Sequence, residues 1–153
     1  MKRFQYNLEN VLNYKNQVLN NLKTQHAAAA DRVNKKQQQL YGMEGTLNQF
    51  QKDFDVTMKQ GVSSETVRLY GICIDGARKQ IEEEKEQLSI LKKEEKKKSQ
   101  EVLTAKMDTS RYEKLRDRRL REYSKAVQKE EEMFAEEFII RSMAGGTGKG
   151  VFI

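Results

Sequence analysis

Proline and tryptophan are absent from this 153-residue sequence, and cysteine and histidine each occur once, as Cys73 and His26. One cysteine cannot form a disulfide within the chain. A metal site needs several ligands at defined spacing, so we expect His26 to lie at the edge of a helix seam or in solvent. Cys73 has no second cysteine in a C-x-x-C motif, and we expect a partly buried structural residue rather than a catalytic thiol.

Long apolar runs are also missing. No stretch of about 18 apolar residues could span a membrane, and no signal-like segment follows Met1-Lys2-Arg3, so we expect a cytoplasmic protein. The Gly-rich end does not match a phosphate-binding loop, because Met143 and Gly150 stand where that loop needs glycine and a hydroxyl residue. No acid, base and nucleophile combine in one pattern. We therefore expect no enzymatic activity, no metal, no cofactor and no small-molecule ligand.

Charged residues and good helix formers fill the sequence instead. Hydrophobic residues make up 37% and charged residues 34%, too few apolar side chains for a core enclosed on all sides. A narrow apolar stripe along each of two long helices can still be buried. The net charge of +6 permits attraction to acidic proteins, anionic lipid or nucleic acid, and selects none of them.

The first long helix is predicted over residues 4–60. Steps of three and four residues between its apolar positions are those of a heptad seam. Leu12 and Leu19 widen the stripe, and Lys15, Gln25 and Lys36 weaken it. A stutter, where two four-residue steps follow each other, falls around the small residues 27–30. The seam positions are Phe4, Leu8, Val11, Val18, Leu22, Val33, Leu40, Met43, Leu47, Phe50 and Phe54.

A turn is predicted at Gly61, which can adopt a left-handed conformation after a helix. Ser63 or Ser64 can cap the second helix, predicted over residues 64–142. The fold class is therefore all-α: an antiparallel coiled-coil hairpin over residues 1–142 with a longer second helix, then a flexible Gly-rich tail over 143–153. The second stripe is Val67, Tyr70, Ile74, Ala77, Ile81, Leu88, Leu91, Val102, Ala105, Tyr112, Leu120, Tyr123, Val127, Phe134 and Phe138.

The greater length of the second helix predicts an overhang past the first helix, beginning around Arg118 to Arg121. The apolar residues of the overhang would have no partner within the chain, which makes this end a candidate docking surface for another protein. They are Val127, Phe134, Phe138, Ile139 and Ile140.

Two further clusters are candidate binding surfaces. Arg116, Arg118, Arg119 and Arg121 could contact an acidic protein or phosphates, or form a solvated face. Aromatic residues gather within about three helical turns of Gly61, where they could either widen the seam or form an apolar docking face. They are Phe50, Phe54 and Tyr70.

The opening sequence, Phe4-Gln5-Tyr6-Asn7-Leu8-Glu9-Asn10-Val11-Leu12, resembles the start of the bacterial flagellar export protein family FliJ. The stretches 70–81, 111–123 and 130–137 are similar to later parts of that family, and the resemblance covers roughly residues 1–142. It implies a stalk-like antiparallel coiled coil that binds the hexameric ATPase of flagellar type III export. It also implies contact with the membrane-bound export gate at the cytoplasmic face, and help in recycling export chaperones.

On this resemblance the arginines at 116, 118, 119 and 121 would face the lining of the ATPase ring. Phe50, Phe54, Tyr70 and Ile74, near the turn, would face the export gate. Two other functions remain open from the residues alone: a generic scaffold or client chaperone, and a nucleic-acid-binding coiled-coil arm. Nucleic-acid binding would weaken steeply with added salt, and we do not expect it.

Overall fold

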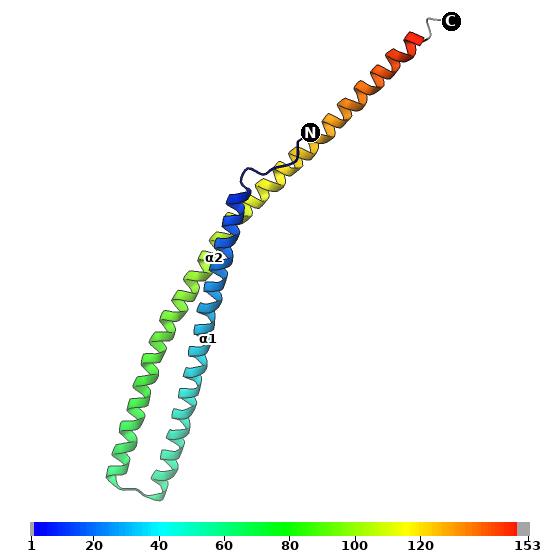
Figure 1. Cartoon of the computed structure of the whole chain (residues 1–153). Helices are drawn as coiled ribbons and strands as arrows, with labels where there is room; N and C mark the ends of the chain where they lie inside the picture. Colours follow the sequence, from blue (N-terminus) through cyan, green and yellow to red (C-terminus); the bar gives the residue numbers. More distant parts are fainter. Residues whose placement is uncertain (1, 150–153) are drawn as a thin grey trace. The chain divides into compact units, whose positions relative to one another are not determined.

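The structure, a computed structural model, describes residues 2–149 and consists of two long helices joined by a short turn (Figure 1). Helix α1 spans Glu9–Gln60 and α2 spans Ser64–Lys149, and no strand occurs among the described residues. The all-α fold with a longer second helix is therefore confirmed. Contacts group the chain into two compact units, residues 18–106 and residues 1–17 with 107–153.

In the unit of residues 18–106, α1 and α2 run antiparallel and bury a narrow seam. Its most buried residues are Leu19, Ala29, Leu40 and Ile81, between 3% and 8% exposed. Ala29 lies within the stutter predicted around residues 27–30, where its small side chain is buried.

 

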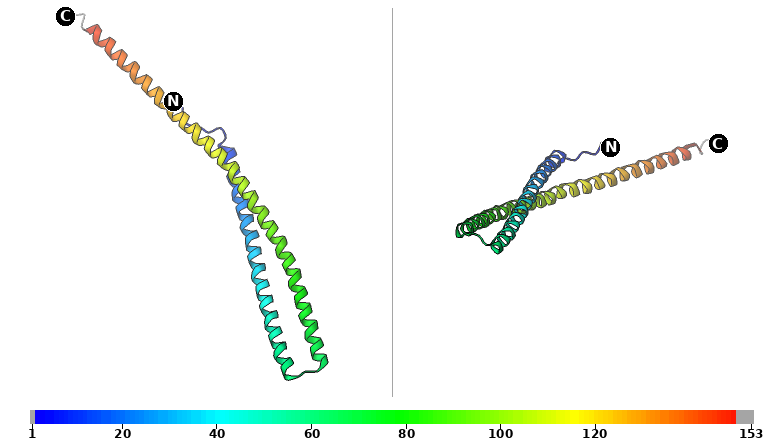
Figure 2. Two further views of the ribbon diagram at one scale, coloured as in Figure 1. Left: turned by 180° about the vertical axis from the view of Figure 1, so that it is seen from behind. Right: turned by 90° about the horizontal axis from the view of Figure 1, so that it is seen from below.

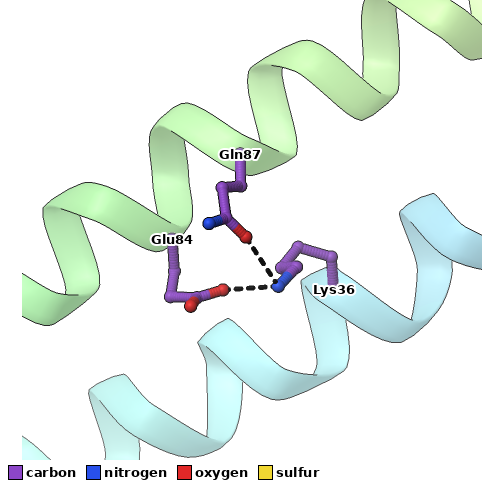
Figure 3. A network of polar contacts seen from close by, with 3 residues as sticks. All are labelled: Lys36, Glu84 and Gln87. Atoms are coloured by element: carbon purple, nitrogen blue, oxygen red, sulfur yellow. Dashed lines mark hydrogen bonds and ion pairs between the residues drawn. The ribbon is translucent and has the colours of Figure 1, made fainter.

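Polar residues also lie in this seam, and each has a partner on the other helix. Lys36, only 18% exposed at its side chain, places Nζ 2.5 Å from Oε2 of Glu84 and donates to Oε1 of Gln87 at 3.3 Å (Figure 3). Lys98 donates to the Gln25 amide oxygen at 2.9 Å. A half-buried polar group is costly unless it is hydrogen-bonded, so the partners of Lys36 offset the weak seam position predicted there. Gln25 is exposed, so its predicted place on the seam was wrong.

His26 lies in the same unit, with Nε2 2.8 Å from Oε1 of Glu95 on α2. Its side chain is 32% exposed, which agrees with the predicted place at the edge of the seam. Among the residues that the structure describes, no cluster of histidine, cysteine or carboxylate side chains could hold a metal ion.

The turn between the helices is formed by residues 61–63, visible in both views of Figure 2. Gly61 has φ of 78°, the left-handed conformation that glycine adopts without a Cβ penalty, and its N–H donates to the Met58 carbonyl at 3.2 Å. Ser63 is the residue that caps α2, because its Oγ accepts from the Thr66 N–H at 3.3 Å. The predicted left-handed glycine is confirmed, and Ser63 rather than Ser64 is the cap.

The second unit pairs the start of the chain with α2 from residue 107 onward. Leu12 is 5% and Thr109 3% exposed, and Thr109 Oγ1 donates to the Lys15 carbonyl at 3.5 Å. Leu12 and Leu19 are more deeply buried than Val11 and Val18. The prediction that they only widen the stripe was therefore wrong, and they occupy its centre.

The start of α1 also differs from the prediction. Helix one was predicted from Phe4, but α1 begins at Glu9, where the N–H donates to the Tyr6 carbonyl at 3.1 Å. The residues before it are not helical because Phe4 and Tyr6 pack against α2 instead: Phe4 contacts Tyr123. Glu9 in the first turn also favours a helix start, since a negative charge there interacts well with the helix dipole.

The end of α2 lies beyond the predicted residue 142, at Lys149. Glycines at 145, 146 and 148 each cost about 1 kcal/mol relative to alanine in a helix. Extending an existing helix needs no new nucleus, however, because each residue adds one hydrogen bond, and the chain has no proline to end it. The flexibility predicted for 143–153 stays a prediction, and residues 150–153 lie outside the described residues.

Within residues 2–149, neither helix contains a segment long and apolar enough to cross a membrane.

Candidate partner-binding surfaces

The N-terminal segment, residues 2–17, covers one face of α2 up to Tyr123. Tyr6 is 7% exposed, and its hydroxyl donates to the Tyr112 carbonyl at 3.0 Å. Phe4 packs against Tyr123 with ring centroids 5.4 Å apart, and the Tyr123 hydroxyl donates to the Lys2 carbonyl. Contacts of Phe4 and Tyr6 in the segment with Tyr112 and Tyr123 on α2 thus hold the segment against the helix.

Two of the four predicted site arginines take part in this pairing. Arg116 places Nε 3.1 Å from Oε2 of Glu9, and the Arg119 guanidinium lies over the Tyr6 ring at 5.7 Å from its centroid. A cation over an aromatic face is attracted by the ring quadrupole. Arg118 and Arg121 are exposed. The cluster therefore divides into two arginines that contact the N-terminal segment and two that face solvent.

Lys15 extends the polar pairing on the other side of Tyr112. Its Nζ lies 2.7 Å from Oδ2 of Asp108 and 5.9 Å from the centroid of the Tyr112 ring. The hydrogen bond to Asp108, and then the negative charge of that carboxylate, raise the pKa of Lys15 above its usual value. Lys15, predicted to weaken the seam, is thus matched by an acidic residue on α2.

Beyond Tyr123 the same helix has no such cover. Every residue from 128 to 145 is exposed. Phe134 is 71% and Phe138 67% exposed, large fractions for rings of this size. The predicted overhang of α2 past α1 is present within this unit.

Glu9, the first residue of α1, pairs with Arg116, so α2 extends past α1 from about the predicted position. The non-helical residues 2–6 continue the antiparallel pairing past the start of α1. Lys2 and Phe4 contact Tyr123 at the end of this pairing, so residues 2–6 cover α2 as far as Tyr123.

The aromatic cluster near the turn lies in the other unit. Phe50 and Phe54 on α1 contact Tyr70 on α2, with ring centroids 5.0 Å and 4.9 Å apart. All three rings and Ile74 are half-buried, because a two-helix pair covers each of them from one side only. The structure thus brings the four predicted tip residues to one end of the hairpin, where part of each remains accessible.

An open apolar groove of about 580 Å³ adjoins this cluster. Cys73 lines it and is exposed, so the prediction of a partly buried cysteine was wrong. The apolar neighbours Ile72 and Ile74 do not bury Cys73, because adjacent helix residues point to different faces, and Ile72 is itself 61% exposed. The other apolar residues of the groove are Met43, Leu47, Phe50, Ala77 and Ile81.

Sequence reasoning missed two residues of the terminal pairing. Tyr6 was part of the opening motif but was given no structural role, and Thr109 was passed over because a hydroxyl residue does not stand out in an apolar pattern. Thr109 lies three residues before Tyr112, a spacing that places both on one helix face. That spacing was the available signal.

Comparison with known proteins gives a match to a protein family. A family model described as Flagellar FliJ protein matches residues 4–146. This range includes the terminal pairing, the turn and most of the exposed end of α2. Neither the curated proteins nor the solved structures contain a significant match to the chain.

Proposed function

The chain belongs to the family of flagellar FliJ proteins, and from this membership we propose that it binds the hexameric ATPase of flagellar protein export. The family makes the chain a component of flagellar export with a coiled-coil fold. In the proposed function it has no catalytic role. It promotes the assembly or the activity of the ATPase, links it to the export gate and assists the recycling of export chaperones at the cytoplasmic face of the membrane.

The observation that carries this proposal is the family match over residues 4–146, nearly the whole chain. The terminal pairing adds a physical argument. Arg118 and Arg121 are exposed, while Arg116 and Arg119 contact Glu9 and Tyr6. We infer that the outward pair binds acidic residues in the lining of the ATPase ring, since arginine forms strong charge-assisted hydrogen bonds with carboxylates. The inward pair would then hold the two terminal segments together.

The tip is the proposed contact for the export gate. The tip consists of four residues near the turn at Gly61, and all of them are half-buried: Phe50, Phe54, Tyr70 and Ile74. Aromatic side chains with one accessible side are common anchors in protein interfaces. Alanine substitution of Phe54 and Tyr70 should weaken binding to the cytoplasmic domain of the gate protein. Unchanged binding would remove the tip from the proposal.

The ATPase proposal is tested by measuring hydrolysis by the cognate export ATPase as the full chain is added at near-physiological salt. Gel filtration of the same mixture reports assembly. We expect faster hydrolysis and a complex of hexamer size. No binding and no stimulation by a fully helical sample would contradict the proposal and favour a scaffold or client chaperone.

A charge-reversal pair locates the contact. Arg118→Glu with Arg121→Glu should abolish stimulation, because two carboxylates would then face an acidic lining. Lys93→Glu with Lys96→Glu is the matched control, since both lysines are exposed on α2 with the same three-residue spacing. Equal loss in both variants would mean that net charge, rather than this site, determines binding.

A further inference from the structure

The exposed end of α2 carries an ordered apolar pattern as well as exposed rings. We define the terminal stripe as Val127, Phe134 and Phe138, which follow Tyr123 at steps of four, seven and four residues. These steps keep the stripe on one helix face. Tyr123 itself packs against Phe4. The terminal stripe therefore continues the face of α2 that the N-terminal segment covers, past the point where that cover ends.

Such a face is suited to another helix. The N-terminal segment shows that this side of α2 accepts aromatic and aliphatic side chains, since Tyr6 and Leu12 are 7% and 5% exposed there. Helices that bind in this way present anchors at three- and four-residue steps. The spacing of Val127, Phe134 and Phe138 offers the complementary positions.

The charges beside the stripe restrict the occupant. Glu130 and Glu137 lie four residues before and three after Phe134 and border the stripe. Glu131, four residues after Val127 and three before Phe134, lies on the stripe itself. Arg141, seven residues after Phe134, is the cation nearest to this face. The border is therefore predominantly acidic. An acidic border repels anionic lipid and nucleic acid.

A second copy of the same segment is also disfavoured. Two antiparallel copies centred on Phe134 would bring Glu130 and Glu131 of one chain beside Glu137 of the other, because these residues lie at similar distances on either side of the centre. Like charges facing each other across a helix pair are destabilising. A helix that places lysine or arginine opposite these glutamates would be attracted to them instead.

We propose that the terminal stripe binds an amphipathic helix of another protein, one whose apolar stripe is bordered by lysine and arginine. The terminal stripe lies after Tyr123 in the chain, so the inference holds whether or not Arg118 and Arg121 contact the ATPase ring.

The test uses the full chain and two synthetic helical peptides of about three heptads. Both carry the same leucine stripe, one bordered by lysine and arginine and the other by glutamate. Fluorescence anisotropy of the labelled peptides gives Kd at about 0.15 M salt, where surface charges are partly screened. We expect the basic peptide to bind at least about tenfold more tightly than the acidic one. Equal affinity would overturn the proposal.

Two sets of variants locate the binding. Phe134→Ala with Phe138→Ala should weaken binding of the basic peptide by about tenfold or more, as loss of aromatic anchors does. Alanine favours helix, so the helix should persist, which circular dichroism checks. Tyr41→Ala is the matched control, because Tyr41 is an equally exposed ring, at 82%, far from the stripe in sequence. Unchanged binding in the double variant would contradict the proposal.

Reversing the charge of the three glutamates separates a role in peptide binding from a role in stabilising the helix. Glu130→Lys, Glu131→Lys and Glu137→Lys together should reverse the preference, so that the acidic peptide binds more tightly. Sedimentation equilibrium of the unliganded chain tests the alternative occupant. A dimer that dissociates when Phe134 and Phe138 are replaced would show that a second copy covers the stripe, and would overturn the proposal.

Discussion

In the unit of residues 1–17 and 107–153, two parts of α2 share an apolar pattern at helical spacing, but the N-terminal segment packs against only one of them. Residues 107–123 pair with the N-terminal segment and include the buried Thr109, whereas every residue from 128 to 145 is exposed. Both parts carry large apolar residues at three- and four-residue steps. What separates them is how far the N-terminal segment reaches: its Lys2 and Phe4 contact Tyr123.

The comparison shows that an apolar stripe does not by itself define a core. The same pattern stabilises the fold where the chain supplies a partner and leaves apolar side chains exposed where it does not. Four substitutions test this distinction, each with a control on an exposed position.

The largest effect is expected at Leu12, which is 5% exposed. Leu12→Ala should lower the free energy of unfolding by about 2–3 kcal/mol, the lower part of the usual range because two helices leave room for relaxation. Phe138→Ala, at a residue 67% exposed, should change it by less than about 0.5 kcal/mol. Urea unfolding followed by circular dichroism measures both. Similar losses would mean that the end of α2 is covered within the folded chain.

Tyr6→Phe should have the next largest effect. It removes the hydrogen bond from the hydroxyl to the Tyr112 carbonyl and leaves a partly buried carbonyl without that donor, at a cost of about 1 kcal/mol. Tyr14→Phe is the control, since Tyr14 is 62% exposed and lies in the same N-terminal segment, residues 2–17. A thermal melt of each variant would reveal the difference, and equal stability would show that the hydroxyl of Tyr6 does not fasten the N-terminal segment.

An effect of similar size is expected for an ion pair in the seam of residues 18–106. Glu84→Gln should lower the free energy of unfolding by about 1 kcal/mol, because Lys36 is 18% exposed and loses a charged partner. Asp31→Asn breaks a pair with Lys35 whose side chains are 60% and 75% exposed, and should cost less than about 0.5 kcal/mol. If the two losses in the free energy of unfolding were equal, burial against the opposite helix would not strengthen an ion pair in this seam.

The smallest effect concerns the pH dependence at Lys15. Asp108 raises the pKa of Lys15, chiefly through their hydrogen bond. A raised pKa means that the folded state holds the proton more tightly than the unfolded state. The pair therefore stabilises the fold below pH 10.5 and loses this contribution as the pH rises through the raised value. Asp108→Asn should lower the pKa of Lys15, measured by NMR titration, whereas Asp117→Asn, at an exposed position of the same helix, should not.

Much of the fold followed from the sequence because helix period, glycine and capping residues are local signals. Gly61 and the serines after it predicted the turn, and the stripes predicted two paired helices. The non-helical start at residues 2–6 could not be predicted, since it depends on contacts of Phe4 and Tyr6 with residues more than a hundred positions away. Cys73 is exposed because of the face of α2 on which it lies. Its apolar neighbours in the sequence do not specify that face.

The candidate sites were predicted less completely. Four arginines close together predicted a basic surface, but sequence spacing could not separate Arg116 and Arg119, which contact the N-terminal segment, from the exposed Arg118 and Arg121. That division depends on which face of α2 the segment covers. The grouping of the aromatic residues near the turn was easier to predict, because the position of Gly61 determines which residues of two antiparallel helices lie opposite each other.

Hydrogen exchange along α2 tests most directly the distinction between its covered and exposed parts. In the full chain, we predict slow exchange of backbone amides in residues 107–120 and fast exchange in residues 128–145, because packing stabilises the first part and every residue of the second is exposed. Addition of the basic amphipathic peptide should slow exchange in 128–145 alone. Equal protection of both parts in the free chain, or no change on adding the peptide, would contradict the account.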